Sequence, residues 1–391
     1  MSRKPFLKTL LIFSLPVLLL GAVIAVFLYT QGAGLNITPA APIETVQFGR
    51  TNLRPGEIEL HVRNTSPETI RISQININDA IWPYTISPSP IIPRLRSAVI
   101  TLKYHWVEGD AYEITVFSSN SIPFHTSIHV ATGTQTVSSG TLWSFTLIGV
   151  YVGVIPVVLG MFWLPALKNL GRRAMIFLMS ATMGLLIYLG IDATTEALES
   201  GAKLGEAFQG IGIVGIGIAG TVLLLDAISR RQMSGAFTEV GRRMALASMI
   251  AVGIGLHNLG EGLAIGAAYA VGAAALGTFL VVGFILQNIT EGLGIIVPIS
   301  RDRPKLRALA LLGLIGGAPA IVGTWVGGLV DSPPLSVLFL SIGAGAVFQV
   351  AYEIGRQLIW KDTAKSPMPL TVFGGILAGM LTLYITGMAI K

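Results

Sequence analysis

The 391-residue sequence contains no cysteine and little charge. The missing thiol excludes disulfides, cysteine nucleophiles, iron–sulfur clusters and thiolate zinc sites. Asp, Glu, Lys and Arg make up only 12% of the residues, about half the share found in an ordinary soluble domain. Hydrophobic residues make up 52%, and glycine occurs 46 times. This composition indicates a membrane protein and argues against a soluble enzyme.

Two further absences limit the function. No Gly-x-x-x-x-Gly-Lys motif occurs, so nothing in the sequence supports ATP-driven pumping by this chain. The net charge of +6 would suit nucleic acid, but most of the 26 basic residues lie in short connections between apolar segments and form no patch. We therefore expect neither a nucleotide nor a nucleic acid as a partner.

Composition divides the chain into three parts. Residues 1–30 contain one apolar run that is nearer to the ~20 residues of a membrane span than to the core of a signal peptide. We expect an N-terminal transmembrane anchor here in preference to a cleaved signal. Residues 31–141 are richer in charge and proline, and they alternate polar with apolar residues as strands do. We expect a small all-β sandwich of about seven strands, with strands over 57–63, 69–77, 99–106 and 112–117.

The third part, residues 142–391, contains eight apolar stretches that are long enough to span a bilayer as helices. Most of the glycines lie here, and small residues let helices approach closely in a membrane. We expect an α-helical polytopic core embedded in the lipid bilayer, and a homodimer stays open as its assembly. The stretches are 142–166, 174–191, 210–229, 244–270, 272–298, 308–330, 335–357 and 369–390.

Lysine and arginine occur in every second connection of this core, as Arg172, Arg230, Arg301 and Arg356 illustrate. Basic connections face the cytoplasm in multi-pass membrane proteins. The pattern predicts a chain in the cell membrane whose N-terminus is cytoplasmic. The β-sandwich and the C-terminus are then both extracytoplasmic.

Two related polar motifs interrupt the fourth and fifth apolar stretches. The first reads LHNLGEG and the second LQNITEG, so both contain Asn-x-x-Glu-Gly. Residues four positions apart share a face of a helix, which places His257 beside Glu261 and Gln287 beside Glu291. A repeated polar motif on adjacent apolar helices favours a functional site over chance structural contacts.

The chemistry of these motifs suggests a metal. Two ionised carboxylates facing each other in a membrane would repel and be poorly solvated, at a cost of several kcal/mol. A divalent cation between them removes both problems, and imidazole, carboxylate and amide oxygen together suit zinc and its neighbours. We expect Zn²⁺ as the transported ion, with Fe²⁺, Mn²⁺ and Cd²⁺ as alternatives. The candidate ligands are His257, Asn258, Glu261, Gln287, Asn288 and Glu291.

These motifs resemble those of the ZIP (Zrt/Irt-like) family of divalent metal transporters, particularly its prokaryotic GufA-like branch. That family carries His-Asn-x-Pro-Glu-Gly in its fourth span and a His- or Gln-led version in its fifth. The resemblance covers about residues 142–391. It implies an eight-helix fold in which metal enters from outside, binds between the fourth and fifth helices, and leaves towards the cytoplasm. Zinc uptake is the function that it implies.

The sequence departs from the family pattern in three places. Gly260 and Thr290 replace the proline before each glutamate, and we expect the helix distortion at the site to survive. In the sixth span the family often has Glu-Pro, whose carboxylate helps to hold a second metal. Here Ala318 precedes the proline, so a second metal position is expected to be weak. The connection 230–243 has no histidine, which argues against a metal-sensing loop.

Other acids in the core have weaker assignments. Asp192 and Glu196 end the second span, where they either attract cations or are solvated helix-end charges. Glu353 resembles the family's carboxylate on the release side, so Asp192 and Glu353 are both candidates for the transport pathway. Asp226 precedes Arg230 by four residues, which predicts an ion pair.

An intramembrane metal-dependent hydrolase is the alternative function. Zinc proteases carry His-Glu-x-x-His, which is absent here. Other membrane hydrolases need several histidines, and residues 142–391 contain only His257. We therefore expect a transporter that is not an enzyme and that uses no catalytic cofactor.

Overall fold

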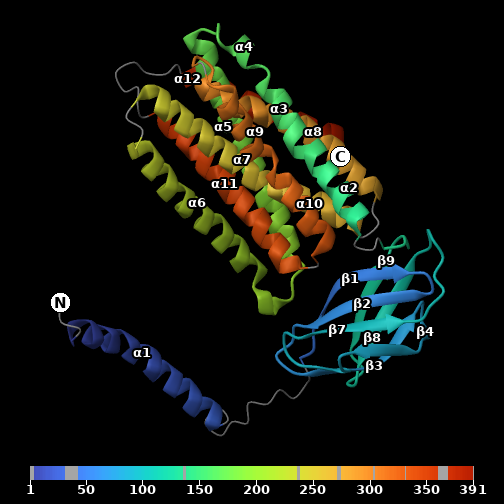
Figure 1. The fold of residues 1–391 in the computed structure, drawn as a ribbon. Coiled ribbons are helices and arrows are strands. Elements are labelled where there is room, and N and C mark those ends of the chain that lie inside the picture. The colour runs from blue at the N-terminus through green and yellow to red at the C-terminus, as the bar shows by residue number, and fades with distance from the viewer. Residues whose placement is uncertain are drawn as a thin grey trace. The chain divides into compact units, whose positions relative to one another are not determined.

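The computed structural model describes residues 4–30, 43–134, 138–235, 238–270, 274–302, 304–330, 332–359 and 369–390. The chain forms two compact units, Met1–Glu44 and Thr45–Lys391. The first unit contains α1 (Lys4–Tyr29), which is an apolar helix over the length of the expected anchor (Figure 1). From Leu15 onward, the side chains of α1 are exposed. Residues 31–42 of the expected sandwich domain lie outside the described residues.

The second unit begins with a small β-sandwich of two antiparallel sheets. One sheet has the strand order β1-β2-β7-β5, and the other has the order β4-β3-β8-β9 with β6 paired to β3. Apolar side chains alternate along the strands, so that Ile58, Leu60 and Val62 of β2 are buried between the sheets. The strands are β1 (Val46–Arg54), β2 (Glu57–Asn64), β3 (Ile70–Ile77), β4 (Ala80–Ile81), β5 (Tyr84–Ser87), β6 (Ile91–Ile92), β7 (Ser97–Leu102), β8 (Tyr112–Ser118) and β9 (Pro123–Ile128).

The bounds expected for three strands agree with those of β2, β3 and β8 to within one residue. The expected strand 99–106 is wrong at its C-terminal end. β7 stops at Leu102 because the following residues leave the sheet. The carbonyl of Lys103 accepts a hydrogen bond from the Trp82 indole at 2.9 Å, and the Trp106 indole donates to the carbonyl of Arg54 at 2.6 Å. The two-residue strands β4 and β6 are too short for the sequence pattern to indicate.

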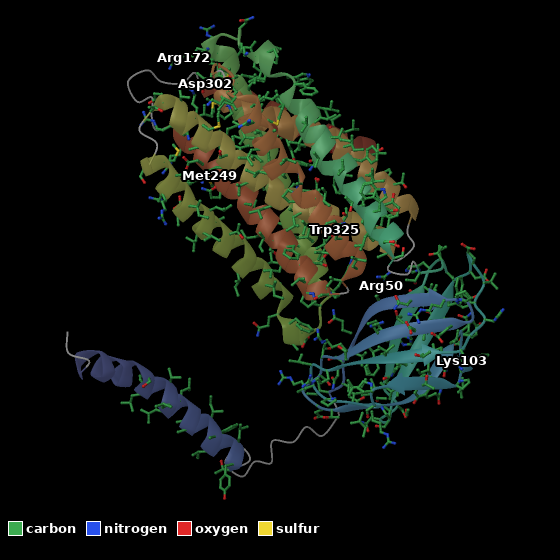
Figure 2. The ribbon with its side chains drawn as sticks, viewed as in Figure 1. Arg50, Lys103, Arg172, Met249, Asp302 and Trp325 are labelled. Atoms are coloured by element: carbon green, nitrogen blue, oxygen red, sulfur yellow. The ribbon has the colours of Figure 1, made fainter. Side chains whose placement is uncertain are left out.

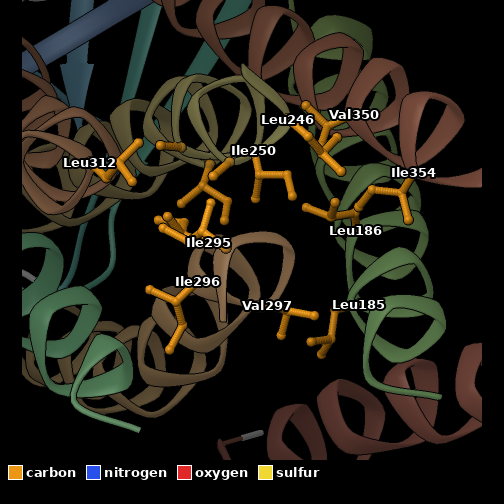
Figure 3. Close-up of a cluster of buried hydrophobic side chains, with 14 of the residues drawn as sticks. Leu185, Leu186, Leu246, Ile250, Ile295, Ile296, Val297, Leu312, Val350 and Ile354 are labelled. Carbon is orange, nitrogen blue, oxygen red and sulfur yellow. The ribbon is translucent and has the colours of Figure 1, made fainter. Parts of the chain in front are cut away.

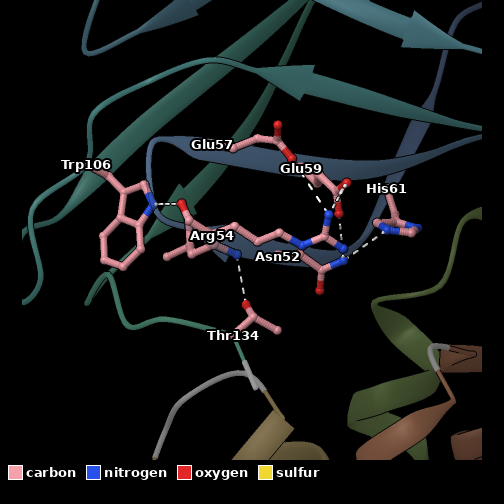
Figure 4. Close-up of polar contacts among 8 residues, drawn as sticks. Asn52, Arg54, Glu57, Glu59, His61, Trp106 and Thr134 are labelled. Carbon is pink, nitrogen blue, oxygen red and sulfur yellow. Dashed lines mark hydrogen bonds and ion pairs between the residues drawn. The ribbon is translucent and has the colours of Figure 1, made fainter. Parts of the chain in front are cut away.

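A polar network fastens the edge hairpin β1–β2 (Figure 4). The Arg54 guanidinium donates to Glu59 at 3.2 Å, and Asn52 contacts His61 at 3.3 Å. Near the middle of β1, the register shifts so that one extra residue is inserted between Phe48 and Thr51. Such a β-bulge redirects a side chain out of the regular alternation.

The rest of the second unit is a helical bundle. Eight of its helices or helix pairs are long and apolar enough to cross a membrane, which indicates a multi-pass membrane protein. The elements are α2 (Ser139–Gly149), a π-helical turn (Val150–Val154), α3 (Ile155–Met161), α4 (Leu164–Leu167), α5 (Arg172–Ala202), a 3₁₀ turn (Glu206–Phe208), α6 (Gly210–Gly235), α7 (Glu239–Ala270), α8 (Ala274–Ile296), a second 3₁₀ turn (Val297–Ile299), α9 (Leu306–Gly317), α10 (Pro319–Leu329), α11 (Pro333–Ile359) and α12 (Pro369–Ile390).

Two of the eight expected spans are interrupted helices. The first contains the π-helical turn between α2 and α3, and the sixth is divided between α9 and α10 at Ala318. A proline follows each irregularity, Pro156 in α3 and Pro319 in α10. Proline has no backbone N–H, so it removes one helical hydrogen bond and favours a break at these positions.

The bundle has two ends, and Figure 2 labels Arg172 and Asp302 at one of them and Arg50 near the other. The C-terminal ends of α5, α7 and α10 lie at the end that contacts the β-sandwich, which we call the sandwich end. At the opposite end lie Arg172, Arg230, Arg243, Arg301 and Arg356, and we call it the arginine end. There the Arg243 guanidinium binds Asp302 with contacts of 2.7 and 3.0 Å, which joins the start of α7 to the α8–α9 connection.

The helices pack in two groups that meet along one interface, which we call the seam. One group contains α2, α3 and α7 to α10, and the other contains α5, α6, α11 and α12. At the seam, Gly343 of α11 lies against the backbone of His257 in α7, and Gly253 lies against Val350. Towards the arginine end, an apolar cluster from both groups fills the seam (Figure 3).

Candidate metal centre

The two polar motifs meet in the interior of the bundle. His257 and Glu261 lie on α7 and Glu291 lies on α8, and all three side chains are buried. One ligand atom from each of them lies within 4.8 Å of the others, which is close enough for one metal ion to contact all three. His257 Nε2 is 3.5 Å from Glu261 Oε1, as the four-residue spacing predicts.

Amides from α8 surround the carboxylate of Glu261. Gln287 Nε2 donates to Oε1 at 2.5 Å, and Asn288 Nδ2 donates to Oε2 at 3.0 Å. Gln287 Nε2 also lies 3.4 Å from His257 Nε2. The amide N–H groups thus occupy the positions that a cation would take beside these ligands. Coordination by Gln287 through its oxygen requires the amide to turn over.

The two asparagines are oriented by the interrupted helices. Asn288 Nδ2 donates to the carbonyl of Val152 at 3.0 Å, and Pro156, four residues later, has no N–H with which to make the α-helical hydrogen bond to this carbonyl. Asn258 Nδ2 donates at 3.0 Å to the carbonyl of Gly316, in the last turn of α9. Each bond fixes the amide nitrogen on the backbone and leaves the amide oxygen free to face another group.

Several oxygens of the centre are buried and unsatisfied. Within the described part of the chain, no hydrogen-bond partner is found for Asn258 Oδ1, for Asn288 Oδ1 or for either carboxylate oxygen of Glu291. Polar neighbours of Glu291 include Glu261, His257 and the amides of Gln287 and Asn258. Buried polar atoms normally have partners, and these four atoms are all acceptors. A cation or a hydrogen-bond donor satisfies such atoms, whereas a further hydrogen-bond acceptor satisfies none.

The helices that carry the centre are continuous, contrary to the expectation of a distortion at Gly260 and Thr290. α7 runs unbroken from Glu239 to Ala270, and α8 runs unbroken from Ala274 to Ile296. Neither replacement removes a backbone N–H, so the helical hydrogen bonds persist. The Thr290 hydroxyl does donate to a backbone carbonyl, that of Gln287, at 2.7 Å. The irregular backbone lies on the facing helices instead.

A small cavity borders the centre. It is lined on one side by α5 and α11 and on the other by α7 and α8, so it lies in the seam. Asp192 and Glu196 of α5 line it together with His257, Glu261 and Gln287. The structure thus places both acids in the lining of the same cavity as the candidate ligands. They lie within α5 and not at its end, contrary to expectation, because the helix continues to Ala202.

On the side of the arginine end, the centre is bordered by apolar side chains. Ile254 lies three residues before His257, and Ile295 lies four residues after Glu291, so both are about one turn nearer to the arginine end. Both belong to the buried cluster of Figure 3. In this structure buried apolar side chains therefore lie about one turn from the candidate ligands on the side of the arginine end.

Glu353 lies apart from the centre. Gly343 is level with His257, so Glu353 is ten residues, or about 15 Å, farther along α11 towards the arginine end. It is fully buried, and Arg356 donates to its Oε1 at 2.8 Å. Its Oε2 and the whole amide of Gln349, one turn earlier, find no partner among the described residues. One ion cannot bind Glu353 and His257 together.

Two further residues for which the sequence analysis made a prediction are Asp226 and Ala318. The predicted ion pair between Asp226 and Arg230 is confirmed, with a separation of 2.7 Å. Ala318 is partly buried at the break between α9 and α10, adjacent to the Gly316–Asn258 contact. The sequence analysis missed the carbonyl of Val152 as a partner, although Pro156 identifies it as the carbonyl without a helical donor.

Neither the protein-family models nor the curated proteins contain a match to this chain. The fold and the centre themselves define a class: a helical bundle of the multi-pass membrane type with a buried histidine–carboxylate group able to hold a metal ion.

Proposed function

We propose that this protein carries divalent transition-metal ions across a membrane, with zinc taken up towards the cytoplasm as its main activity. The observation that supports this proposal most directly is the set of unsatisfied acceptors around His257, Glu261 and Glu291. The centre combines one imidazole with two carboxylates, a donor set that suits zinc. The two negative charges balance one dication.

The position of the centre favours transport over a static structural metal site. A structural site is closed on all sides, whereas this one borders a cavity that is also lined by the acids Asp192 and Glu196 of α5. These acids attract cations into the cavity. Glu353 and Gln349, buried among the residues of the apolar cluster, then offer polar groups on the way to the arginine end.

The direction of transport rests on charge. Because basic connections face the cytoplasm, we assign the arginine end to the cytoplasm and the sandwich end to the outside of the cell membrane. α1 is then a separate N-terminal anchor. The resemblance of the two motifs to those of ZIP transporters supports the same direction and the same site. Opening towards the cytoplasm requires the apolar cluster of Figure 3 to separate along the seam.

Metal uptake into sealed proteoliposomes tests the proposal. Zinc should accumulate inside vesicles that contain the protein, and Fe²⁺, Mn²⁺ and Cd²⁺ should be compared at equal concentration. Glu261→Ala and Glu291→Ala should each abolish uptake, because each removes a ligand and half of the counter-charge. Equal uptake by the variants and the unmodified protein would refute the site. A metal-dependent hydrolase would leave the metal outside the vesicles.

A further inference from the structure

The β-bulge in β1 directs Arg50 onto the ends of two helices. Its guanidinium donates to the carbonyl of Ala270 at 2.8 Å and to the carbonyl of Gly328 at 3.3 Å. These carbonyls end α7 and α10, where helices carry partial negative charge and lack internal donors. α7 also carries His257 and Glu261. Arg50 therefore joins the sandwich to the metal-bearing side of the seam (Figure 2).

The sandwich also contacts the helix group on the other side of the seam. It does so through Arg63 of β2 and through Thr65, which follows β2. Arg63 lies over the ring of Phe208, with 5.2 Å between its guanidinium carbon and the ring centroid. A Cβ added to Gly205 would lie 2.7 Å from the Cβ of Thr65, so the Gly205 backbone packs directly against the Thr65 side chain. Gly205 and Phe208 belong to the α5–α6 connection.

A groove lies between the Arg50 contact and the contact with the α5–α6 connection. Its lining shows which helix ends the sandwich faces. It is bounded by residues 47–50 of β1 and by the ends of α5, α7, α10 and α11. The cavity of the metal centre is lined by three of the same helices, α5, α7 and α11. The sandwich therefore crosses the end of the seam through which the metal would move.

We propose that the β-sandwich is a strap that couples the two sides of the seam, and that one of its two contacts must open in each transport cycle. This inference rests on the proposed function, because transport requires the two helix groups to move relative to each other. Charge-assisted hydrogen bonds are about twice as strong as neutral ones, and Arg50 makes two of them. The sandwich thus stays with α7 and α10, and its contact with the α5–α6 connection is the one that opens.

An engineered disulfide tests the strap. The chain has no cysteine, so Thr65→Cys with Gly205→Cys gives a single thiol pair at the contact that should open. A disulfide needs about 3.5–4.5 Å between the Cβ atoms, which a shift of about 1 Å provides. Oxidation of this double variant in proteoliposomes should reduce zinc uptake at least about tenfold, and a reductant should restore it.

Adding Arg50→Ala to the disulfide variant provides the decisive comparison. With the Arg50 contact removed, the sandwich can remain on the α5–α6 connection while α7 and α10 move. Uptake by the oxidised triple variant should therefore recover to within about threefold of its reduced form. Full uptake by the oxidised double variant would overturn the strap. A triple variant that stays blocked when oxidised, although Arg50→Ala alone transports zinc, would overturn the role of Arg50.

Two controls separate the strap from the proposed function. The single cysteine variants should transport equally with and without oxidant. If the unmodified protein does not take up zinc, the proposed function is refuted. Hydrogen exchange then tests the contact of Arg50 with α7 and α10 by itself. Arg50→Ala should then increase amide exchange in the last turns of both α7 and α10, since both ends lose their charged donor. Unchanged exchange in those turns would overturn the contact.

Discussion

Replacing Glu291 with glutamine should have opposite effects on metal binding and on the stability of the metal-free protein. Glu291 is buried, and neither of its oxygens has a hydrogen-bond partner in the described structure. The glutamine side chain has nearly the same shape but carries no charge. The change Glu291→Gln therefore removes the attraction for a cation and also the cost of burying an unpaired carboxylate.

The expected loss of affinity follows from the charges. At a distance of about 4 Å and an effective dielectric constant near 20, a carboxylate and a dication attract by about 8 kcal/mol. The glutamine amide oxygen can still coordinate the cation, and this residual attraction offsets about half of the loss. The remaining 3–4 kcal/mol, roughly, corresponds to zinc binding that is weaker by about 10²- to 10³-fold.

The metal-free protein should become more stable by about 1–3 kcal/mol, the usual cost of an unsatisfied buried polar group. Zinc titration by calorimetry and thermal unfolding in detergent, with and without zinc, measure both effects. Asp226→Asn is the matched control, because Asp226 is already paired with Arg230 at 2.7 Å. That change should leave zinc affinity intact and should not raise stability. Unaltered zinc binding by Glu291→Gln, or a loss of metal-free stability, would refute this account of the centre.

Four further predictions concern the same chain. Zinc affinity should fall as the pH is lowered from about 7.5 to 5.5, because imidazole and carboxylates bind metal deprotonated; a flat profile in zinc titrations would contradict this. Pro156→Ala should weaken zinc binding about tenfold by returning a helical donor to the carbonyl that orients the Asn288 amide, whereas Pro165→Ala should not. In sealed cells, an impermeant thiol reagent should label the exposed Ser119→Cys but not Ser234→Cys; the reverse pattern would invert the topology. Purified protein should hold one tightly bound zinc, since two carboxylates balance one dication, and Ala318→Glu should raise the zinc content towards two; two full ions in the unmodified protein would refute the charge argument.

The helices and the pairing of the two motifs could be predicted from the sequence because both are local features. Apolar runs of membrane-spanning length mark the eight helices. The four-residue spacing from His257 to Glu261 fixes the shared face within one helix. Repetition of the motif about one helix later suggested that the faces of α7 and α8 meet, and the structure brings these side chains together.

The support of the centre could not be predicted in the same way. The carbonyl that holds the Asn288 amide belongs to Val152, 136 residues earlier in the chain. Which carbonyl faces which asparagine depends on how the helices rotate against each other, and no local pattern encodes that. The prolines did mark the breaks, but sequence reasoning placed the distortion at Gly260 and Thr290. Glycine and threonine tolerate a helix break, but they keep the backbone N–H whose loss makes proline cause one.

The tight contact between α7 and α10 makes the metal-bearing helix a stiff lever. A methyl group at Gly262 would overlap the carbonyl of Ala320, and one at Gly323 would overlap the carbonyl of Leu259. With backbone against backbone, there is no compressible layer of side chains between the two helices. Ala270 is 13 residues beyond His257, which makes the lever arm about 20 Å long. A tilt of about 5° at the Arg50 contact would displace the ligands by about 1.7 Å, many times the 0.2 Å or so that metal–ligand distances tolerate. A small rotation of the sandwich is therefore sufficient to take the coordination sphere apart.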